Sequence, residues 1–447
     1  MYISIKFYLA VILFAMFSHC SLAKHNFPFE KNNSNYQIHN DSVRVPKAYE
    51  LFTIADSLIK MHGYKKAVEF LTNYEKYYSD PMEKGMFNQV MMTYQSYKGD
   101  TKAALKYESQ LSPNKQTEDY SFPENFMATP ASTVIMNLSA NKQVVMFNEA
   151  HHRPQHRAFI RSLLKDFYSL GFRTLLVEAY FENEDSLLND RGYPLQKTGS
   201  YTKEPAFGQM LREAKNLGFT IASYDNDTTT CNSTEPFVCN NQREKVAAEN
   251  IFNFIKTNPN AKILVAAGYA HIIKKSDDGW IKMAEQFKNI SGINPLSIDL
   301  VGMAERSSAE YENKFYKAAM EKYNIIVPSV ILNNETKEVF LRNYSQEQID
   351  LQIVFPRTKY TNGYSDWLSE GYKKEIKVNL TKTSCKVGDL LQVYIKNEVE
   401  KYSNQAVPFL QYPLNDIKQQ KLLLPENYTY SIVVDHGVTK STVKVTK

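Results

Sequence analysis

The stretch VVMFNEAHH, residues 144–152, joins a buried-strand pattern to acid–base side chains. Its apolar residues predict a strand, and Glu149, His151 and His152 follow where that strand ends. A carboxylate beside an imidazole can activate water, because each shifts the pKa of the other toward neutrality. The same side chains could hold a divalent metal ion. The stretch therefore points either to acid–base hydrolysis or to metal binding.

Three other apolar segments end in groups of the same kind. TLLVEA ends at Glu178, FTIASYDND ends at Asp225 and Asp227, and KILVAAGYAH leads through Gly268 to His271. In open parallel sheets, ligands bind at the carboxyl ends of the strands. We therefore expect these side chains to converge at one sheet edge, and we interpret four of them as the catalytic group: Glu149, His152, Glu178 and His271.

The elements that must position these groups lie in residues 120–372, where strand and helix patterns alternate. Segments with helical spacing, such as RAFIRSLLKDFYSLG and REKVAAENIFNFIKT, lie between most of the apolar strands. Continuous apolar strands separated by helices predict an α/β domain with a mostly parallel sheet, covered on both faces. The expected strands are 143–149, 174–178, 219–225, 262–268, 295–301 and 350–355.

Two flanking regions have different patterns. Residues 45–115 contain four helical segments, and GYKKAVEF at Gly63 resembles GDTKAALK at Gly99, as in a TPR-like helix pair that packs or docks a protein partner. Residues 374–447 alternate apolar and polar residues without a helical segment, which predicts a small antiparallel β-sandwich. The predicted fold class is thus multidomain: a helical TPR-like region, a central α/β domain and a β-sandwich.

Composition narrows the class of protein. The chain has 447 residues, 43% of them hydrophobic and 23% charged, with a formal net charge of +5. These values are ordinary for a folded globular protein of two or three domains. No basic block of the kind that binds nucleic acid is present in the sequence, so a nucleic-acid partner is not expected.

The first residues predict export. Lys6 is followed by the short apolar run FYLAVILFAMF, and Ser21 and Ala23 supply the small residues of a cleavage site. We expect a signal peptide over residues 1–23, cleaved after Ala23, and a disordered leader over 24–44. Cys20 keeps a lipoprotein as the alternative. No later segment is apolar for long enough to span a membrane, so a periplasmic or secreted protein is expected.

Two cysteines flank a short polar loop. Cys231 and Cys239 enclose NSTEPFV, a spacing that suits a small disulfide loop in an oxidising compartment. The alternative is two free thiols in a loop. Cys385 is expected to be a free thiol in either case.

The motifs resemble those of the erythromycin esterase family over about residues 130–372. NEAHH resembles its GExxH signature, GFRTLLVEA its GFxxlalE strand, REKVAAENI its RDxxMAxN helix, and AAGYAHI a later strand end that carries a histidine. The helix after the first motif also carries an arginine where that family tends to have one. The matching residues are Glu149, His152, Arg161, Glu178, Arg243, Asn250 and His271.

This resemblance implies metal-independent hydrolysis of an ester, a lactone or an amide in a small-molecule or peptide substrate. His152 would be the general base on water, with Glu149, Glu178 and Arg161 positioned around it. Supporting or substrate-binding roles are expected for His151, Asp225 and Arg243. No cofactor is implied, and no serine or cysteine lies in a nucleophile-elbow context such as G-x-S-x-G.

Departures from the family pattern leave other functions open. Asn148 stands where the esterases have glycine, and Gly268-Tyr269 stands where they tend to have HNxH. The E-x-H and G-x-x-H spacings resemble equally the haem-binding ChaN-like lipoproteins and the Tiki-type metalloproteases, in which His151 would replace His152. The ligands of a haem or a divalent metal would then come from His151, His152, His271 and Glu149. A third alternative is an interaction protein with a degenerate site.

We expect the exported protein to begin at Lys24, because Ser21 and Ala23 fit a signal-peptidase site. N-terminal sequencing of exported protein tests this expectation. Retention of Met1, or a lipid on Cys20, would contradict cleavage after Ala23.

Overall fold

The structure is a computed structural model that describes residues 45–113, 115–178, 182–225, 231–361, 363–381, 384–437, 439–443 and 445–446. The expected signal peptide (1–23), the expected leader (24–44) and Asp227 lie outside these residues. No helix in the described ranges combines the length and the apolar character needed to cross a bilayer.

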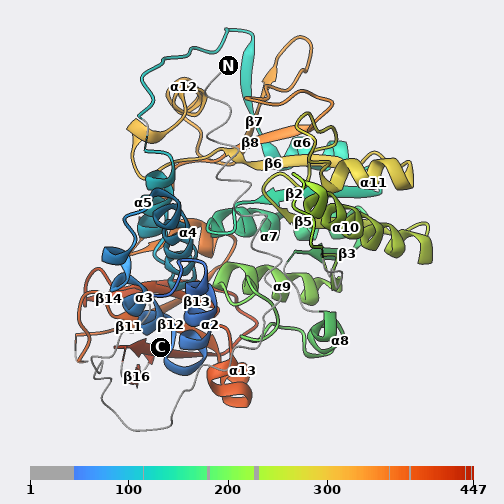
Figure 1. Cartoon of the computed structure of the whole chain (residues 1–447). Coiled ribbons are helices and arrows are strands. Elements are labelled where there is room, and N and C mark those ends of the chain that lie inside the picture. Colours follow the sequence, from blue (N-terminus) through green and yellow to red (C-terminus); the bar gives the residue numbers. More distant parts are fainter. Residues whose placement is uncertain are drawn as a thin grey trace.

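An eight-stranded sheet forms the centre of the molecule (Figure 1), in the order β1-β7-β8-β6-β2-β5-β3-β4. The six strands from β8 to β4 are parallel neighbours, and they are the six strands that the apolar segments predict. The predicted mostly parallel sheet is therefore confirmed. The strands are β1 (Phe126–Pro130), β2 (Val144–Glu149), β3 (Phe172–Val177), β4 (Thr220–Ser223), β5 (Lys262–Gly268), β6 (Leu296–Met303), β7 (Ser329–Asn333) and β8 (Leu351–Val354).

Strands β1 and β7 are additions that the sequence patterns do not predict. They pair antiparallel with each other, and β7 pairs antiparallel with β8 at one edge of the sheet. Each has only five residues, and β1 is partly exposed and ends at Pro130. Short edge strands of this kind lack the continuous apolar run of the interior strands.

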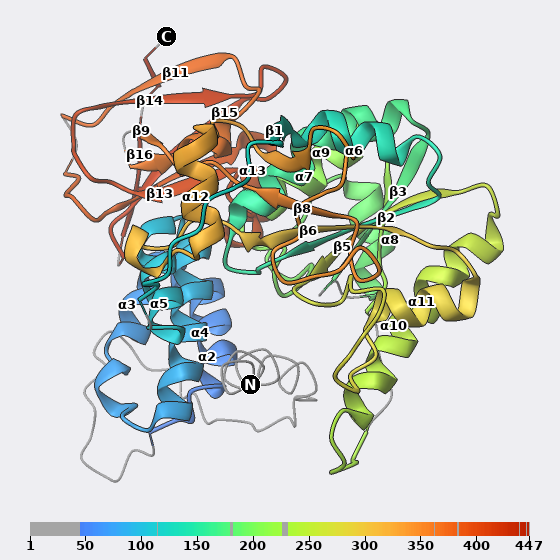
Figure 2. The same ribbon diagram turned by 90° about the horizontal axis from the view of Figure 1, so that it is seen from above.

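Helices cover both faces of the sheet (Figure 2). Along β2, Val145 and Phe147 face the core formed with α6 (Ala131–Ser139), α7 (Pro154–Ser169) and α9 (Pro205–Leu217). Val144 and Met146 face the opposite core, formed with α10 (Val238–Thr257) and α11 (Met283–Ser291). Because successive strand residues point to opposite faces, both faces of β2 are apolar and buried. Helices α8 (Glu182–Arg191) and α12 (Lys314–Tyr323) complete the central region.

The four predicted N-terminal helices are present as α2 (Glu50–His62), α3 (Tyr64–Thr72), α4 (Pro81–Lys98) and α5 (Thr101–Leu111). Asp80 caps α4 by accepting hydrogen bonds from the backbone N–H groups of Met82 and Glu83. Gly99 ends α4 with a φ of 82°, and a Cβ added there would lie 2.0 Å from the carbonyl oxygen of Gln411. Only glycine allows this approach between α4 and the C-terminal part of the chain.

The C-terminal residues form two small antiparallel sheets, β14-β11-β17 and β13-β12-β15-β16. One apolar cluster is shared by both sheets and also includes Ala158 of α7 and Ala206 of α9. The strands are β11 (Lys374–Asn379), β12 (Leu390–Ile395), β13 (Leu410–Pro413), β14 (Gln419–Leu424), β15 (Tyr430–Asp435), β16 (Lys440–Thr442) and β17 (Val445–Thr446).

A helix interrupts these strands, so the expectation of an uninterrupted strand region is wrong at one place. Helix α13 (Lys396–Tyr402) lies between β12 and β13. Its seven residues are too few to show a helical period in the sequence. Glu398 on α13 is buried and pairs with Arg212 of α9, with Nη2 and Oε2 2.6 Å apart. The helix therefore ties the C-terminal sheets to the central region.

Asn148 joins three neighbouring strands near their carboxyl ends. Its Nδ2 donates to Asp299 Oδ1 on β6 at 2.6 Å and to the carbonyl oxygen of Tyr269 at 2.7 Å. Its Oδ1 accepts from the N–H of Leu300 at 2.6 Å. A glycine here, as in the esterases, would leave these buried groups without these partners, so the asparagine has a structural role of its own.

Replacing Asn148 by alanine should lower the free energy of unfolding by about 2–4 kcal/mol, because a buried carboxylate and two backbone groups lose their partner. Urea unfolding followed by circular dichroism measures the change. A loss below about 0.5 kcal/mol would show that water replaces the amide at little cost.

Candidate active site

Three adjacent parallel strands place the candidate site. Glu149 at the end of β2 is in register with Gly268 at the end of β5, and the N–H of Glu178 donates to Ala266 O at 3.1 Å. A Cβ added at Gly268 would lie 2.6 Å from His151 Nε2 and 2.8 Å from Glu178 Oε2. The missing side chain of Gly268 therefore makes room for an imidazole and a carboxylate beside it. The structure brings Glu149, His151 and Glu178 to one sheet edge.

Glu149 is buried and is held by an arginine. Arg157 of α7 donates from Nε to Oε2 at 2.7 Å and from Nη2 to Oε1 at 2.5 Å. Burial alone would raise the pKa of the carboxyl, but Arg157 and His151 outweigh it and bring the pKa to about 2. Glu149 is therefore an anion at neutral pH and a poor proton acceptor.

His151 lies between Glu149 and Glu178. Its Nδ1 is 3.0 Å from Glu149 Oε1, and its Nε2 is on the Gly268 side of the ring, near Glu178. The ring stacks on Tyr201, with centroids 3.9 Å apart and planes inclined by 11°. Carboxylate, ring stacking and glycine together fix the orientation of this imidazole.

Glu178 accepts hydrogen bonds from two directions. The N–H of Gly268 donates to Oε2 at 2.5 Å, and Arg243 Nη2 donates to Oε1 at 2.9 Å. His271 Nε2 is 3.7 Å from the same Oε1. Burial opposes ionisation, but His271, His151, Arg243 and the Gly268 N–H together lower the pKa to about 2. Glu178 is therefore also an anion at neutral pH.

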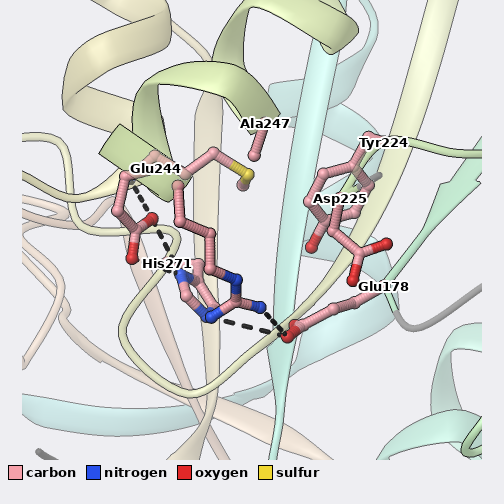
Figure 3. Close-up of a pocket in the computed structure, with 8 residues that line it drawn as sticks. Glu178, Tyr224, Asp225, Glu244, Ala247 and His271 are labelled. Atoms are coloured by element: carbon pink, nitrogen blue, oxygen red, sulfur yellow. Dashed lines mark hydrogen bonds and ion pairs between the residues drawn. The ribbon is translucent and has the colours of Figure 1, made fainter. Parts of the chain in front are cut away.

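His271 is paired with a second carboxylate on its other side. Its Nδ1 lies 2.8 Å from the carboxylate of Glu244, which also accepts from Trp280 Nε1 at 2.9 Å and from the N–H of Met283 at 2.7 Å. Burial lowers the pKa of His271, but Glu244 and Glu178 outweigh burial and the net shift is upward. Figure 3 shows the imidazole between the Glu244 and Glu178 carboxylates.

A small pocket opens at His271 (Figure 3). The space open to the centre of a water molecule is about 10 Å³, close to what one water needs. Asp225, the residue at the end of the β4 segment, reaches the same pocket. Its lining is Glu178, Tyr224, Asp225, Arg243, Glu244, Ala247, His271 and Met283.

His152 is directed away from this group. Its Nε2 lies 3.3 Å from Glu108 Oε1 on α5, and its Nδ1 lies 3.3 Å from the hydroxyl of Tyr269. Burial lowers the pKa of His152 and Glu108 raises it, with a net shift downward. Of the two adjacent histidines, His151 is the one that the structure places between Glu149 and Glu178.

Two other predicted positions lie apart from the pocket. Arg161 donates from Nη2 to the carbonyl oxygen of Glu370 at 3.2 Å and lies over the ring of Tyr372. Asn250 donates to the carbonyl oxygen of Tyr224 at 2.9 Å, which holds the end of β4 on α10. The first residue is thus used in packing against the C-terminal region, and the second supports the site indirectly.

Several site residues escape sequence reasoning. Arg157 lies one turn before Arg161 on the same face of α7, so the sequence does not show which of the two arginines reaches Glu149. Glu244 directly follows Arg243 in the REKVAAENI segment, and its buried position could not be read from one sequence. Tyr201 and Glu108 belong to segments without strand-end or motif signals.

The residues of the alternative ligand set for a divalent metal or a haem have other partners in this structure. In the described part of the chain, no three or more His, Cys, Asp or Glu side chains are arranged to hold a metal ion. Arg157 already binds Glu149 and Arg243 already binds Glu178, so an added cation would face two guanidinium groups. The pocket beside His271 is also far smaller than a haem.

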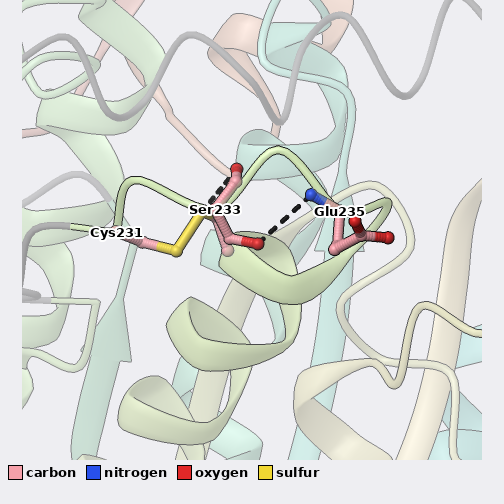
Figure 4. Close-up of a disulfide and its surroundings, with 4 residues drawn as sticks. Cys231, Ser233 and Glu235 are labelled. Carbon is pink, nitrogen blue, oxygen red and sulfur yellow. Dashed lines mark hydrogen bonds between the residues drawn. A yellow bond between two sulfur atoms is a disulfide. The ribbon is translucent and has the colours of Figure 1, made fainter.

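The expected disulfide is present (Figure 4). Cys231 and Cys239 are bonded to each other, and Cys385 is buried. Cys239 belongs to the first turns of α10, the helix that carries Arg243 and Glu244. The bond therefore anchors the loop before α10 next to the pocket. A disulfide fits an extracellular protein.

No family model and no curated protein matches the chain. Among solved structures, the type III effector HopBA1 is 13% identical, with a TM-score of 0.30, over 42% of this chain and 95% of that one. The effector domain RRSP of a MARTX toxin from Vibrio vulnificus is 12% identical, with a TM-score of 0.30, over 65% and 71%. The C-terminal region of Pasteurella multocida toxin is 10% identical, with a TM-score of 0.28, over 55% and 35%. Similarities this weak carry no argument about fold or function.

Glu149→Gln should be about 3–5 kcal/mol less stable than the wild type at pH 7, because Arg157 stays buried without its anion. The folded-state pKa of Glu149 is depressed to about 2. The contribution of ionised Glu149 to the free energy of unfolding is therefore complete above its unfolded-state pKa of about 4.5, and it is lost as the pH falls toward 2. The difference between variant and wild type should close over that window in denaturant unfolding experiments.

Glu375→Gln is the matched control, because Glu375 pairs with Lys421 on an accessible part of β11. Its difference from wild type should be much smaller at every pH. A Glu149→Gln difference that stays constant from pH 7 to pH 2 would contradict the ionised, paired state of Glu149.

Proposed function

We propose that the chain is an exported hydrolase of the erythromycin esterase-like type that activates water at this strand-end site to cleave an ester, a lactone or an amide. The observation that carries the proposal is the placement of His271. Its Nδ1 is held by Glu244, its Nε2 lies 3.7 Å from the Glu178 carboxylate, and both residues line a pocket with room for about one water.

His271 suits the proton-transfer step. Glu244 accepts a hydrogen bond from Nδ1–H, so the neutral ring presents an unprotonated Nε2 toward Glu178 and the pocket. Glu244 and Glu178 raise the pKa of His271 against the effect of burial, and these carboxylates would stabilise the imidazolium that forms when the ring takes a proton. His271 would take a proton from water during attack and return it to the leaving group.

Glu178 and Arg243 suit supporting roles in the same step. Glu178 stays ionised and can accept a hydrogen bond from the attacking water, which orients it beside His271 Nε2. Arg243 lines the pocket and can stabilise negative charge that develops on the substrate oxygen. Water attacks the carbonyl carbon, the bond to the leaving alcohol or amine breaks, and His271 carries the proton between them.

The NEAHH stretch contributes through His151 in this proposal. The prediction that His152 is the general base remains untested, but His151 is the histidine near Glu178. The Glu149–His151 pair places a second oriented imidazole near the Glu178 carboxylate. His152 then supports the turn through Glu108.

Three finer expectations belong to the same proposal. We propose that α2–α5 form a TPR-like arrangement, supported by the packing of α2 on α3 and of α4 on α5 around one apolar cluster. The shared core of the two C-terminal sheets supports a small β-sandwich. The disulfide supports a periplasmic or secreted location.

His271→Ala should lower kcat/KM by about 10²–10⁴-fold on the substrate that an ester, lactone and amide screen identifies, because a positioned general base is lost. His62→Ala is the control, since His62 lies on the exposed end of α2. Glu244→Gln should shift the acidic limb of the pH–rate profile to lower pH, because Glu244 raises the pKa of His271.

Activity of His271→Ala within threefold of the wild type would exclude His271 as the base. Loss of activity on chelation, with recovery in Mn²⁺ or Zn²⁺, would show instead that these residues are metal ligands.

A further inference from the structure

We propose that the N-terminal helices α2–α5 are a positioning part of the active site, which hold His151 from two sides. The inference rests on the proposed hydrolytic function of the strand-end site. One contact region is the segment 195–204, which carries Tyr201. The other is the turn 150–153, which carries His151 itself.

Three of the four helices hold the segment 195–204. The hydroxyl of Tyr64 on α3 donates to the carbonyl oxygen of Lys203 at 2.8 Å, and the hydroxyl of Tyr97 on α4 donates to the carbonyl oxygen of Ser200 at 2.9 Å. Lys203 Nζ lies 2.7 Å from Asp56 Oδ2 on α2. The backbone on both sides of Tyr201 is therefore fixed by side chains from the helices.

This segment acts on the site through two side chains. Tyr201 presents its ring to His151 at 3.9 Å between centroids. Glu204 accepts from Arg157 Nη1 at 3.2 Å and caps α9 by accepting from the N–H groups of Ala206 and Phe207. A shift of the segment would therefore move the face on which His151 rests and one partner of Arg157.

Helix α5 holds the turn after β2. Glu108 is buried among three basic side chains: Arg153 Nη2 lies 2.5 Å from Oε2, Arg306 Nη1 lies 2.7 Å from Oε1 and His152 Nε2 lies 3.3 Å from Oε1. Arg153 Nη2 also donates to the carbonyl oxygen of Glu305 at 2.7 Å. The two residues that follow His151 are thus fixed on an anion supplied by α5.

His151 lies where these two sets of contacts meet. The turn sets where its Cα lies, and Tyr201 sets the plane of its ring. Neither Tyr97 nor Glu108 contacts Glu178 or the pocket residues in the described structure, so both are positioning residues. His151 lies near Glu178, the carboxylate that orients the attacking water in the proposed function, so a displaced His151 ring would disturb that carboxylate. Because misplacement by about 1 Å can cost about 10²-fold in rate, small displacements of the helices would be visible in kcat.

The test compares Tyr97→Phe and Glu108→Gln with Tyr107→Phe, all in the full chain. Tyr107 lies on α5 and its hydroxyl reaches Glu75 at 3.5 Å, away from the site, so its loss removes the same group without touching either contact region. Tyr97→Phe should lower kcat about 3–10-fold, Glu108→Gln should lower it more, and both should leave KM within about twofold. Tyr107→Phe should leave kcat unchanged.

The ring protons of His151 supply a readout that does not depend on activity. Stacking on Tyr201 shifts their NMR signals upfield. The variant Tyr201→Leu lacks the stacking ring and gives the reference chemical shift of the unstacked imidazole. Tyr97→Phe and Glu108→Gln should move the signals toward this position, whereas Tyr107→Phe should not. Glu108→Asp keeps the anion and should recover part of both the shift and kcat. If Glu108→Gln fails to fold, Tyr97→Phe alone tests the positioning role, because the loss of one hydroxyl group should leave the fold intact.

The two proposals fail in different ways. If the wild type cleaves no ester, lactone or amide, the proposed function fails, while the His151 signals still report whether the helices position that ring. If Tyr97→Phe and Glu108→Gln both match Tyr107→Phe in His151 signals and in kcat, the positioning role is overturned.

Discussion

The ion pair between Glu149 and Arg157 is the interaction on which the rest of the site depends. Both side chains are removed from water, and an anion in that position is sustained only by a cation with matching geometry. The buried Arg157 guanidinium has further anionic and aromatic neighbours. It pairs with Glu204 and lies over the rings of Tyr201 and Phe207. The segment before α9 must therefore lie against α7, and this requirement brings Tyr201 onto His151.

Buried charges are also paired in the part of the site around Glu178 and His271. Glu178 is ionised beside Arg243, and Glu244 is shared between His271, Trp280 and the backbone of Met283. Two imidazoles lie near the Glu178 carboxylate, and each is also paired with a second carboxylate. Because carboxylates alternate with basic side chains, several titratable groups can lie close together in a buried site without strong repulsion.

Much of this arrangement could be predicted from the sequence, because apolar runs followed by polar residues mark parallel strands and their carboxyl ends. That logic found the six parallel strands and placed Glu149, Glu178 and His271 at one edge. It could not decide between His151 and His152, since adjacent residues on a turn point in directions that only the surrounding contacts fix. Glu108 and Tyr201 come from segments that approach the site only in the folded chain. Arg157 and Arg161 lie one turn apart on the same face of α7, and only the folded structure shows that Arg157 is the one beside Glu149.

Gly99 has a consequence for how the chain comes together. It lets α4 approach the backbone of Gln411, and Leu390 of β12 belongs to the same apolar cluster as the N-terminal helices. The helices α2–α5 thus lack part of their core until the segment that carries Leu390 and Gln411 has been made. Contacts this distant in sequence are slow to form, so the nascent chain cannot complete its helical region before its C-terminal strands arrive. A polypeptide that matures in this order reaches its final packing late, after synthesis and, if it is exported, on the far side of the membrane, where the bond between Cys231 and Cys239 can also form.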